Sequence, residues 1–162
     1  MTRILINASI NPIEDFGINM ENKELKTASD FIEYLEKINF SKHLKKIEKR
    51  LKNKTIILYG AGSFFQTLAD KYDLSSLNII AIADRKFINH SADETFYGYK
   101  VCEPDELVQL KPDFILVSML YYVQIIEHLE ETVLNNQKIK IKPLINKPFV
   151  EVWKEIWNQQ CQ

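Results

Sequence analysis

Two of the four glycines in this 162-residue chain lie together, in the run Gly60-Ala61-Gly62-Ser63. The first glycine permits a tight turn with positive φ, and the second lets the main chain come close to a bound phosphate. Ser63 to Gln66 has the S-x-x-Q pattern of a capping box, which predicts a helix that starts directly after the glycines. Because the N–H groups at a helix start attract anions, the run predicts a phosphate-binding site.

An acidic residue follows at the distance that dinucleotide-binding folds use. Asp84 stands 24 positions after Gly60, and in those folds an acid about 20 residues after the glycines accepts hydrogen bonds from ribose hydroxyls. Arg85 and Lys86 come next. They could neutralise a 2′-phosphate or be ordinary loop charges, and the sequence leaves both interpretations open.

One residue departs from the dinucleotide-binding pattern. Phe65 occupies the position of the third glycine, which normally allows close packing of helix on strand. The phenylalanine must push the helix outward or point elsewhere, and Ala69 could supply the close contact instead. We expect this departure to affect the pose of a dinucleotide more than the fold.

A further candidate follows the apolar segment 113–118. In a doubly wound sheet the loop after this segment borders the ligand crevice, so the Ser118 hydroxyl could contact a ribose or phosphate; the alternative is a helix cap. The predicted cofactor-binding residues are therefore Gly60, Ala61, Gly62, Ser63, Phe64, Asp84, Arg85 and Ser118.

The elements that must position these residues alternate between strands and helices. Buried strands are predicted at 55–59, 78–83 and 113–118, a short strand at 99–101, and a lysine-rich edge strand at 138–144. Helices are predicted at 27–38, 41–52, 63–72, 104–110, 120–133 and 148–157, with a loop at 85–98 and a short strand at 3–8. This alternation indicates a parallel sheet covered on both faces.

The predicted fold is therefore an α/β, Rossmann-like, three-layer doubly wound domain with a five-stranded, mainly parallel sheet. Its boundaries fall at residues 1–53 for an N-terminal extension with two helices, 54–147 for the nucleotide-binding domain and 148–162 for a C-terminal helix. Trp153 and Trp157 form one stripe on that last helix, which is typical of a core or dimer contact.

Composition excludes several classes of function. The chain is 46% hydrophobic and 27% charged with a net charge of −1, which is the balance of a globular protein and not of a basic nucleic-acid binder. The basic face of helix 41–52 carries no aromatic residue for base stacking, and we interpret it as a solvated face. No apolar run approaches the length of a membrane span, so we expect a cytoplasmic protein without membrane contact.

Other catalytic signatures are missing from the sequence. It contains no Tyr-x-x-x-Lys and no G-x-S-x-G motif. The histidines are scattered and the two cysteines lie far apart, so no metal site is predicted. We interpret His128 as a surface residue and Cys102 as a buried apolar one, and give His90 low weight as a loop residue within reach of a crevice. The catalytic residues, if any, stay unknown.

Several motifs in residues 54–147 stand in a recurring order: Tyr59 to Ser63, Asp84, Gly98 to Val101, Asp105-Glu106-Leu107, and Asp113 to Ser118. In this order they resemble the nucleotide-binding Rossmann domains of bacterial sugar-modification proteins. These include the N-terminal domains of polysaccharide-biosynthesis nucleotide-sugar enzymes and of sialic-acid-type sugar O- and N-acetyltransferases. Where those families often have a run of acids after the second strand, this chain has Asp84-Arg85-Lys86.

The resemblance implies a nucleotide-sugar or NAD bound in a crevice at the sheet edge, in bacterial surface-polysaccharide or sugar-modification metabolism. The chain lacks the left-handed β-helix of the acetyltransferases, so we do not expect acetyl transfer. Similar domains in sugar C-methyltransferases suggest an accessory role beside a sugar-modifying partner enzyme, and a homodimer is compatible with that role. Two alternatives stay open: a non-catalytic interaction module with a vestigial crevice, and a domain related to S-adenosylmethionine-dependent methyltransferases.

Overall fold

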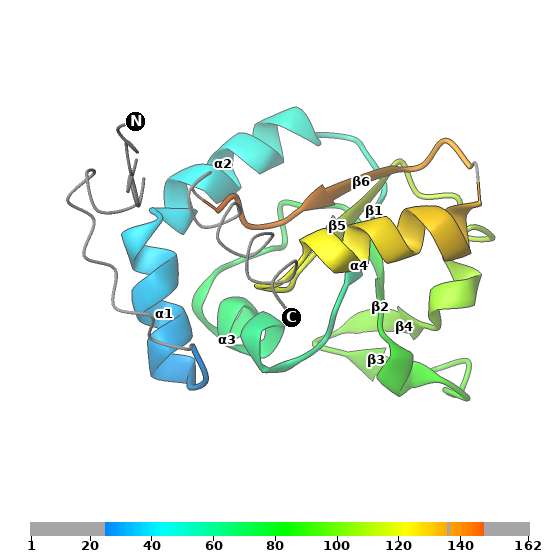
Figure 1. Cartoon of the computed structure of the whole chain (residues 1–162), viewed down its shortest axis with the longest axis horizontal. Helices are drawn as coiled ribbons and strands as arrows, with labels where there is room; N and C mark the ends of the chain where they lie inside the picture. Colours follow the sequence, from blue (N-terminus) through cyan, green and yellow to red (C-terminus); the bar gives the residue numbers. More distant parts are fainter. Residues whose placement is uncertain (1–24, 136, 148–162) are drawn as a thin grey trace, which may run out of the picture.

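The computed structural model describes residues 25–135 and 137–147. The predicted strand at 3–8 and the predicted helix at 148–157, with both tryptophans, lie outside the described residues. Within those residues the protein has an α/β fold, in which one sheet is flanked by helices (Figure 1).

The sheet has six strands in the order β3-β4-β2-β1-β5-β6. All neighbouring strands pair in parallel except β3 and β4, which form an antiparallel pair. The prediction of a mainly parallel sheet is confirmed. The predicted number of five strands is wrong, because the segment 85–98, which was predicted as a loop, contains a sixth strand. The strands are β1 (Ile56–Tyr59), β2 (Ile79–Ala83), β3 (Thr95–Phe96), β4 (Tyr99–Cys102), β5 (Phe114–Val117) and β6 (Lys140–Pro143).

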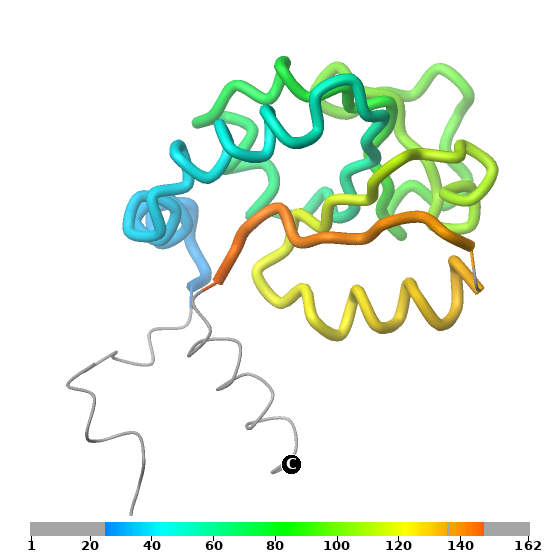
Figure 2. Tube along the Cα trace, turned by 90° about the horizontal axis from the view of Figure 1, so that it is seen from above, coloured from blue at the N-terminus to red at the C-terminus, as the bar shows by residue number. Residues whose placement is uncertain are grey.

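Helices of the described residues lie on both sides of this sheet. Figure 2 shows α4 on the opposite side of the sheet from α3, and Figure 1 shows α4 crossing in front of the strands. The helices are α1 (Ala28–Lys37), α2 (Phe40–Arg50), α3 (Ser63–Lys71) and α4 (Val123–His128), which continues into the π-helical turn η4 (Leu129–Leu134). Two short 3₁₀ turns are η2 (Arg85–Phe87) and η3 (Pro104–Glu106).

Two helix predictions are wrong in extent. The predicted helix at 104–110 is only the 3₁₀ turn η3 followed by turns, and the chain then takes a left-handed conformation at Lys111, where φ is 45°. The helix predicted from residue 120 starts instead at Val123. Apolar spacing predicted both segments correctly as non-strand, but periodicity does not fix where a helix begins.

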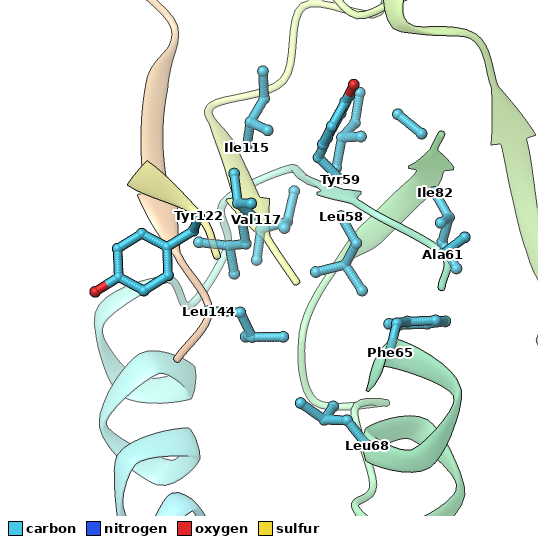
Figure 3. Packing of buried hydrophobic residues seen from close by; sticks show 14 of the residues in the cluster. Leu58, Tyr59, Ala61, Phe65, Leu68, Ile82, Ile115, Val117, Tyr122 and Leu144 are labelled. Atoms are coloured by element: carbon cyan, nitrogen blue, oxygen red, sulfur yellow. The ribbon is translucent and has the colours of Figure 1, made fainter. Parts of the chain in front are cut away.

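One hydrophobic core joins the sheet to the N-terminal helices. All four residues of β1 are buried, and Phe31 and Leu35 of α1 belong to the same buried cluster as Leu58 and Leu68. Figure 3 shows Leu58 directed toward the α3 side of β1, while Tyr59 points the other way. This alternation follows from the pleat of a strand and gives each face of β1 its own set of contacts.

Two local features lie near the ends of the described region. Thr27 and Asp30 form a reciprocal capping box at the start of α1, with Asp30 N–H donating to Thr27 Oγ1 over 3.1 Å. β6 lies at one edge of the sheet, as predicted, and its lysines Lys140 and Lys142 are exposed. No helix of the described residues has the length and apolar character needed to cross a membrane.

Candidate functional site

The loop between β1 and α3, residues 60–63, is here called the glycine turn. Gly60 has φ of +104°, a conformation that L side chains rarely adopt. A Cβ atom on Gly60 would lie 2.6 Å from Cγ of Met119, which follows β5. The first glycine is therefore required by the turn itself and by the close approach of the methionine side chain.

The second glycine has a different surrounding. Gly62 is the N-cap of α3 with φ of −76°, and a Cβ atom built on it would meet nothing within 4 Å. The predicted capping box at Ser63 is wrong, because the extended backbone of Gly62 starts the helix one residue earlier and places Ser63 in its first turn. No side chain caps this helix.

The start of α3 therefore keeps its main-chain donors. Among the described residues, no acceptor is found for the N–H groups of Gly62, Ser63 and Phe64. The open space beside Gly62 gives a ligand room to approach them. A helix start with unused donors and room in front of it is suited to an anion.

Asp84 contacts the glycine turn directly. One of its carboxylate oxygens accepts a hydrogen bond from Ala61 N–H over 2.7 Å, and the other accepts from Lys86 N–H over 3.0 Å. The Lys86 ammonium group donates to the Ala61 carbonyl over 2.6 Å and lies 3.9 Å from the centre of the Phe96 ring. The N–H and the carbonyl oxygen of Ala61 are thus both held by charged side chains that directly follow β2.

Ser118 supports the same turn from the end of β5. Its side chain is buried, and its hydroxyl lies 3.0 Å from the Tyr59 carbonyl oxygen and 2.6 Å from that of Gly60. Its own N–H donates to the Tyr59 carbonyl over 2.8 Å. The structure therefore places Ser118 as a support beneath the turn, and α4 begins too far along the chain for Ser118 to cap it.

The two phenylalanines of α3 point away from the turn into the core. Phe64 packs edge-on against Phe31 of α1, with ring centres 5.4 Å apart. Phe65 is fully buried and contacts the rings of Phe96 and Tyr97, at 6.0 and 5.7 Å. Figure 3 shows the Phe65 ring lying between α3 and the strand that carries Ile82. Phe65, at the third-glycine position, is thus part of a buried aromatic cluster, and its ring does not cover the start of α3.

A cavity of about 310 Å³ opens on the other face of β1. The Arg85 guanidinium lies 3.3 Å from Nε2 of His128, and its charge acts on the Tyr59 phenol. Burial raises the pKa of Tyr59, and the neighbouring Arg85 charge opposes that rise. No acidic partner of Arg85 is found in the described part of the chain. The cavity is lined by Tyr59, Arg85, Ile88, Glu103, Pro104, Asp105, His128, Thr132 and Val133.

The structure thus brings the glycine turn and Asp84 together at the carboxyl ends of β1 and β2, with Ser118 beneath them from β5. Phe64 offers only its main-chain N–H there, because its ring is buried against Phe31, and the Arg85 side chain lies at the cavity instead.

The structure adds two residues to the predicted set. Tyr59 directly precedes Gly60, so its place in the chain could have indicated a role. His128 carries no sequence signal of that kind and was predicted, correctly, only as exposed. Cys102 is buried as predicted, and burial raises its pKa to about 12, which makes it a poor nucleophile.

Comparison with known protein families found one matching family model. The model of the C2185-like N-terminal domain matches residues 52–140, which is more than half of the chain. The chain belongs to the C2185-like N-terminal domain family. The part shared with this family runs from just before β1 to the first residue of β6, so it contains the glycine turn, Asp84, Ser118 and the cavity. No curated protein and no solved structure is significantly similar to the chain.

Proposed function

We propose that the protein binds a nucleotide, either NAD or a nucleotide-sugar, with its diphosphate at the start of α3. The observation that carries this proposal is the uncapped first turn of that helix, where Gly62, Ser63 and Phe64 keep unused N–H donors beside open space. Such a turn combines several aligned donors with the positive end of the helix dipole.

The topology of the sheet supports the proposal. If the antiparallel β3 is left out, the strands follow the order β4-β2-β1-β5-β6. From β1 the chain first adds β2 and β4 on one side, and then crosses to add β5 and β6 on the other side of β1. This order resembles that of a Rossmann-like doubly wound fold, in which ligands bind outside the carboxyl ends of the strands where the direction reverses. The glycine turn lies at that point, between β1 and its neighbour β5.

The remaining groups at the edge have roles in this proposal. Each Asp84 oxygen has one protein donor and can accept a second hydrogen bond, so the carboxylate can still hold a ribose hydroxyl. Arg85, without an acidic partner in the described residues, supplies a positive charge to the cavity where another part of the nucleotide would lie. From the resemblance of its motifs to sugar-modification domains, we infer that this binding serves surface-polysaccharide metabolism, beside a sugar-modifying partner enzyme.

The test is a thermal-shift screen of the full chain with NAD, NADP, UDP-sugars, coenzyme A and S-adenosylmethionine. A ligand at about 100 times its Kd stabilises a protein by about 2.7 kcal/mol, which corresponds to a rise in Tm of at least about 5 °C here. Gly62→Ala fits the backbone but adds a methyl group to the open space beside the free donors, so it should reduce the shift. Ser76→Ala, at an exposed site in the loop before β2, is the control that should retain it.

One observation favours a second candidate, a non-catalytic interaction module. Asp84 and Lys86 hold Ala61 through contacts within the protein, which would stabilise the turn as a purely structural corner. The absence of a shift with every compound of the screen would support this candidate. A shift with S-adenosylmethionine alone would instead indicate a domain related to methyltransferases.

A further inference from the structure

A histidine and two glutamates from separate segments meet near the cavity. The donor atoms of His90, Glu103 and Glu106 all lie within 4.8 Å of one another, and the three side chains are half-buried. His90 belongs to the loop after η2, whereas Glu103 directly precedes η3 and Glu106 is the last residue of η3. This group, here called the His90 cluster, is separate from the glycine turn, but Glu103 also lines the cavity.

The hydrogen bonds of His90 fix which ring nitrogen carries a proton. Its Nδ1 lies 3.0 Å from the carbonyl oxygen of Ser91, and because a carbonyl only accepts, Nδ1 must donate. In the neutral ring Nε2 then has a free lone pair. A histidine that donates one nitrogen to a main-chain carbonyl and presents the other is the usual arrangement of a metal ligand.

The contact made by the other nitrogen requires a cation. Nε2 of His90 lies 2.9 Å from Oε2 of Glu106, and a bare lone pair facing a carboxylate oxygen at that distance would be repulsive. Either a proton on Nε2 or a metal ion held by both atoms removes the repulsion. Two ligand atoms about 2.1 Å from a metal lie about 3.0 Å from each other at an octahedral angle and about 3.4 Å at a tetrahedral one, so the observed 2.9 Å is close to the spacing of two adjacent ligands.

The glutamates are positioned for such a role by main-chain contacts. Oε2 of Glu106 also accepts a hydrogen bond from Glu103 N–H over 2.8 Å, which fixes this carboxylate at the start of η3. The Glu103 side chain lies within the same 4.8 Å. One imidazole and two carboxylates form a donor set that suits Zn²⁺ or Mn²⁺ better than the oxygen-seeking Ca²⁺ or Mg²⁺.

We propose that His90, Glu103 and Glu106 bind a divalent transition-metal ion of the zinc class at the wall of the cavity. The ion ties the loop after η2 to the segment after β4, which no strand pairing joins directly at these residues. Sequence patterns miss the site because His90 lies 13 positions before Glu103 in the chain, far from any short metal-binding motif.

The experiment titrates Zn²⁺ into the untagged full chain, with calorimetry and thermal shift as readouts. We expect one Zn²⁺ per chain and a rise in Tm, with a much smaller response to Mg²⁺ and Ca²⁺. His90→Gln keeps an amide that can still donate to Glu106, and Glu103→Gln leaves the His90–Glu106 contact intact. Each variant should weaken Zn²⁺ binding by at least about tenfold.

The matched controls are Glu127→Gln and Glu131→Gln, which remove exposed carboxylates outside both the cluster and the cavity lining. Both should bind Zn²⁺ as the unmodified chain does. Circular dichroism verifies that each variant is folded. Zn²⁺ binding that survives in both cluster variants, an equal response to Mg²⁺, or no Zn²⁺ binding at all would overturn the proposal. The last result would identify the occupant of the His90–Glu106 contact as a proton.

Discussion

The Asp84 carboxylate and the Ala61 N–H, 23 positions apart in the chain, form a 2.7 Å hydrogen bond at the carboxyl end of the sheet. This bond ties the end of β2 to the glycine turn that follows β1. The acid that the sequence singles out for a ribose therefore already has a partner, and any ribose must share the carboxylate with the turn. Its structural and ligand-binding contributions can be separated by mutation.

Asp84→Asn should destabilise the protein by about 1–3 kcal/mol, because the amide cannot accept from both Ala61 N–H and Lys86 N–H. Urea unfolding measures the change. Asp93→Asn, at an exposed site in the loop before β3, should change the free energy of unfolding by much less. Equal stability of the two variants would show that the contact with Ala61 contributes nothing.

The two glycines of the turn should respond differently to alanine. Gly60→Ala should cost about 3 kcal/mol, because its φ of +104° is strained for alanine and its Cβ atom would overlap Met119. Gly62→Ala should cost about 1 kcal/mol or less, the difference between glycine and alanine at an N-cap. Chemical denaturation of the two variants side by side tests this order, and a larger loss for Gly62→Ala would refute it.

Ser118→Ala should lower stability by about 1–2 kcal/mol, because it removes the hydroxyl that reaches the Tyr59 and Gly60 carbonyls in a buried place. We expect the affinity for any ligand found in the screen to change less than with Gly62→Ala. Thermal unfolding and ligand titration measure the two effects. Unchanged stability together with lost binding would instead assign the hydroxyl to the ligand.

His43 of α2 should make stability depend on pH. Its Nε2 is buried without a hydrogen-bond partner in the described residues, and burial lowers its pKa from 6.5, as do Lys46 and Arg50 to a lesser degree. The unfolded chain therefore binds a proton more readily. Stability should be highest above about pH 6.5 and fall as the pH decreases from there toward the lowered pKa of the folded state.

The difference between the unmodified chain and His43→Gln isolates this effect. Unfolding free energies measured from about pH 5 to about pH 8 should show a steeper loss on the acid side for the unmodified chain. His128→Gln, which replaces an exposed histidine, should retain the slope of the unmodified chain. Parallel curves for His43→Gln and the unmodified chain would contradict the prediction.

The sequence by itself determined the elements whose signal is local. Fully apolar runs indicated β1 and β5, helical spacing indicated α1 to α3, and alternating lysines placed β6 at an edge. The glycine run located a turn between a strand and a helix, because a positive φ beside a close approach leaves few other residues possible. The boundaries of α4 and of the turn after β4 were less well predicted, since periodicity does not report a helix end.

Tertiary structure decided which distant groups share one space. Asp84 holds Ala61, Ser118 lies under Gly60, and His90 reaches Glu106, although each pair is separated by 16 or more positions in the chain. The two-residue strand β3 also forms only because its partner β4 provides a ladder. These contacts depend on the order of the strands and on the path of the loops across the sheet edge. Long-range packing determines the strand order and the loop paths, and no local pattern of residues encodes either of them.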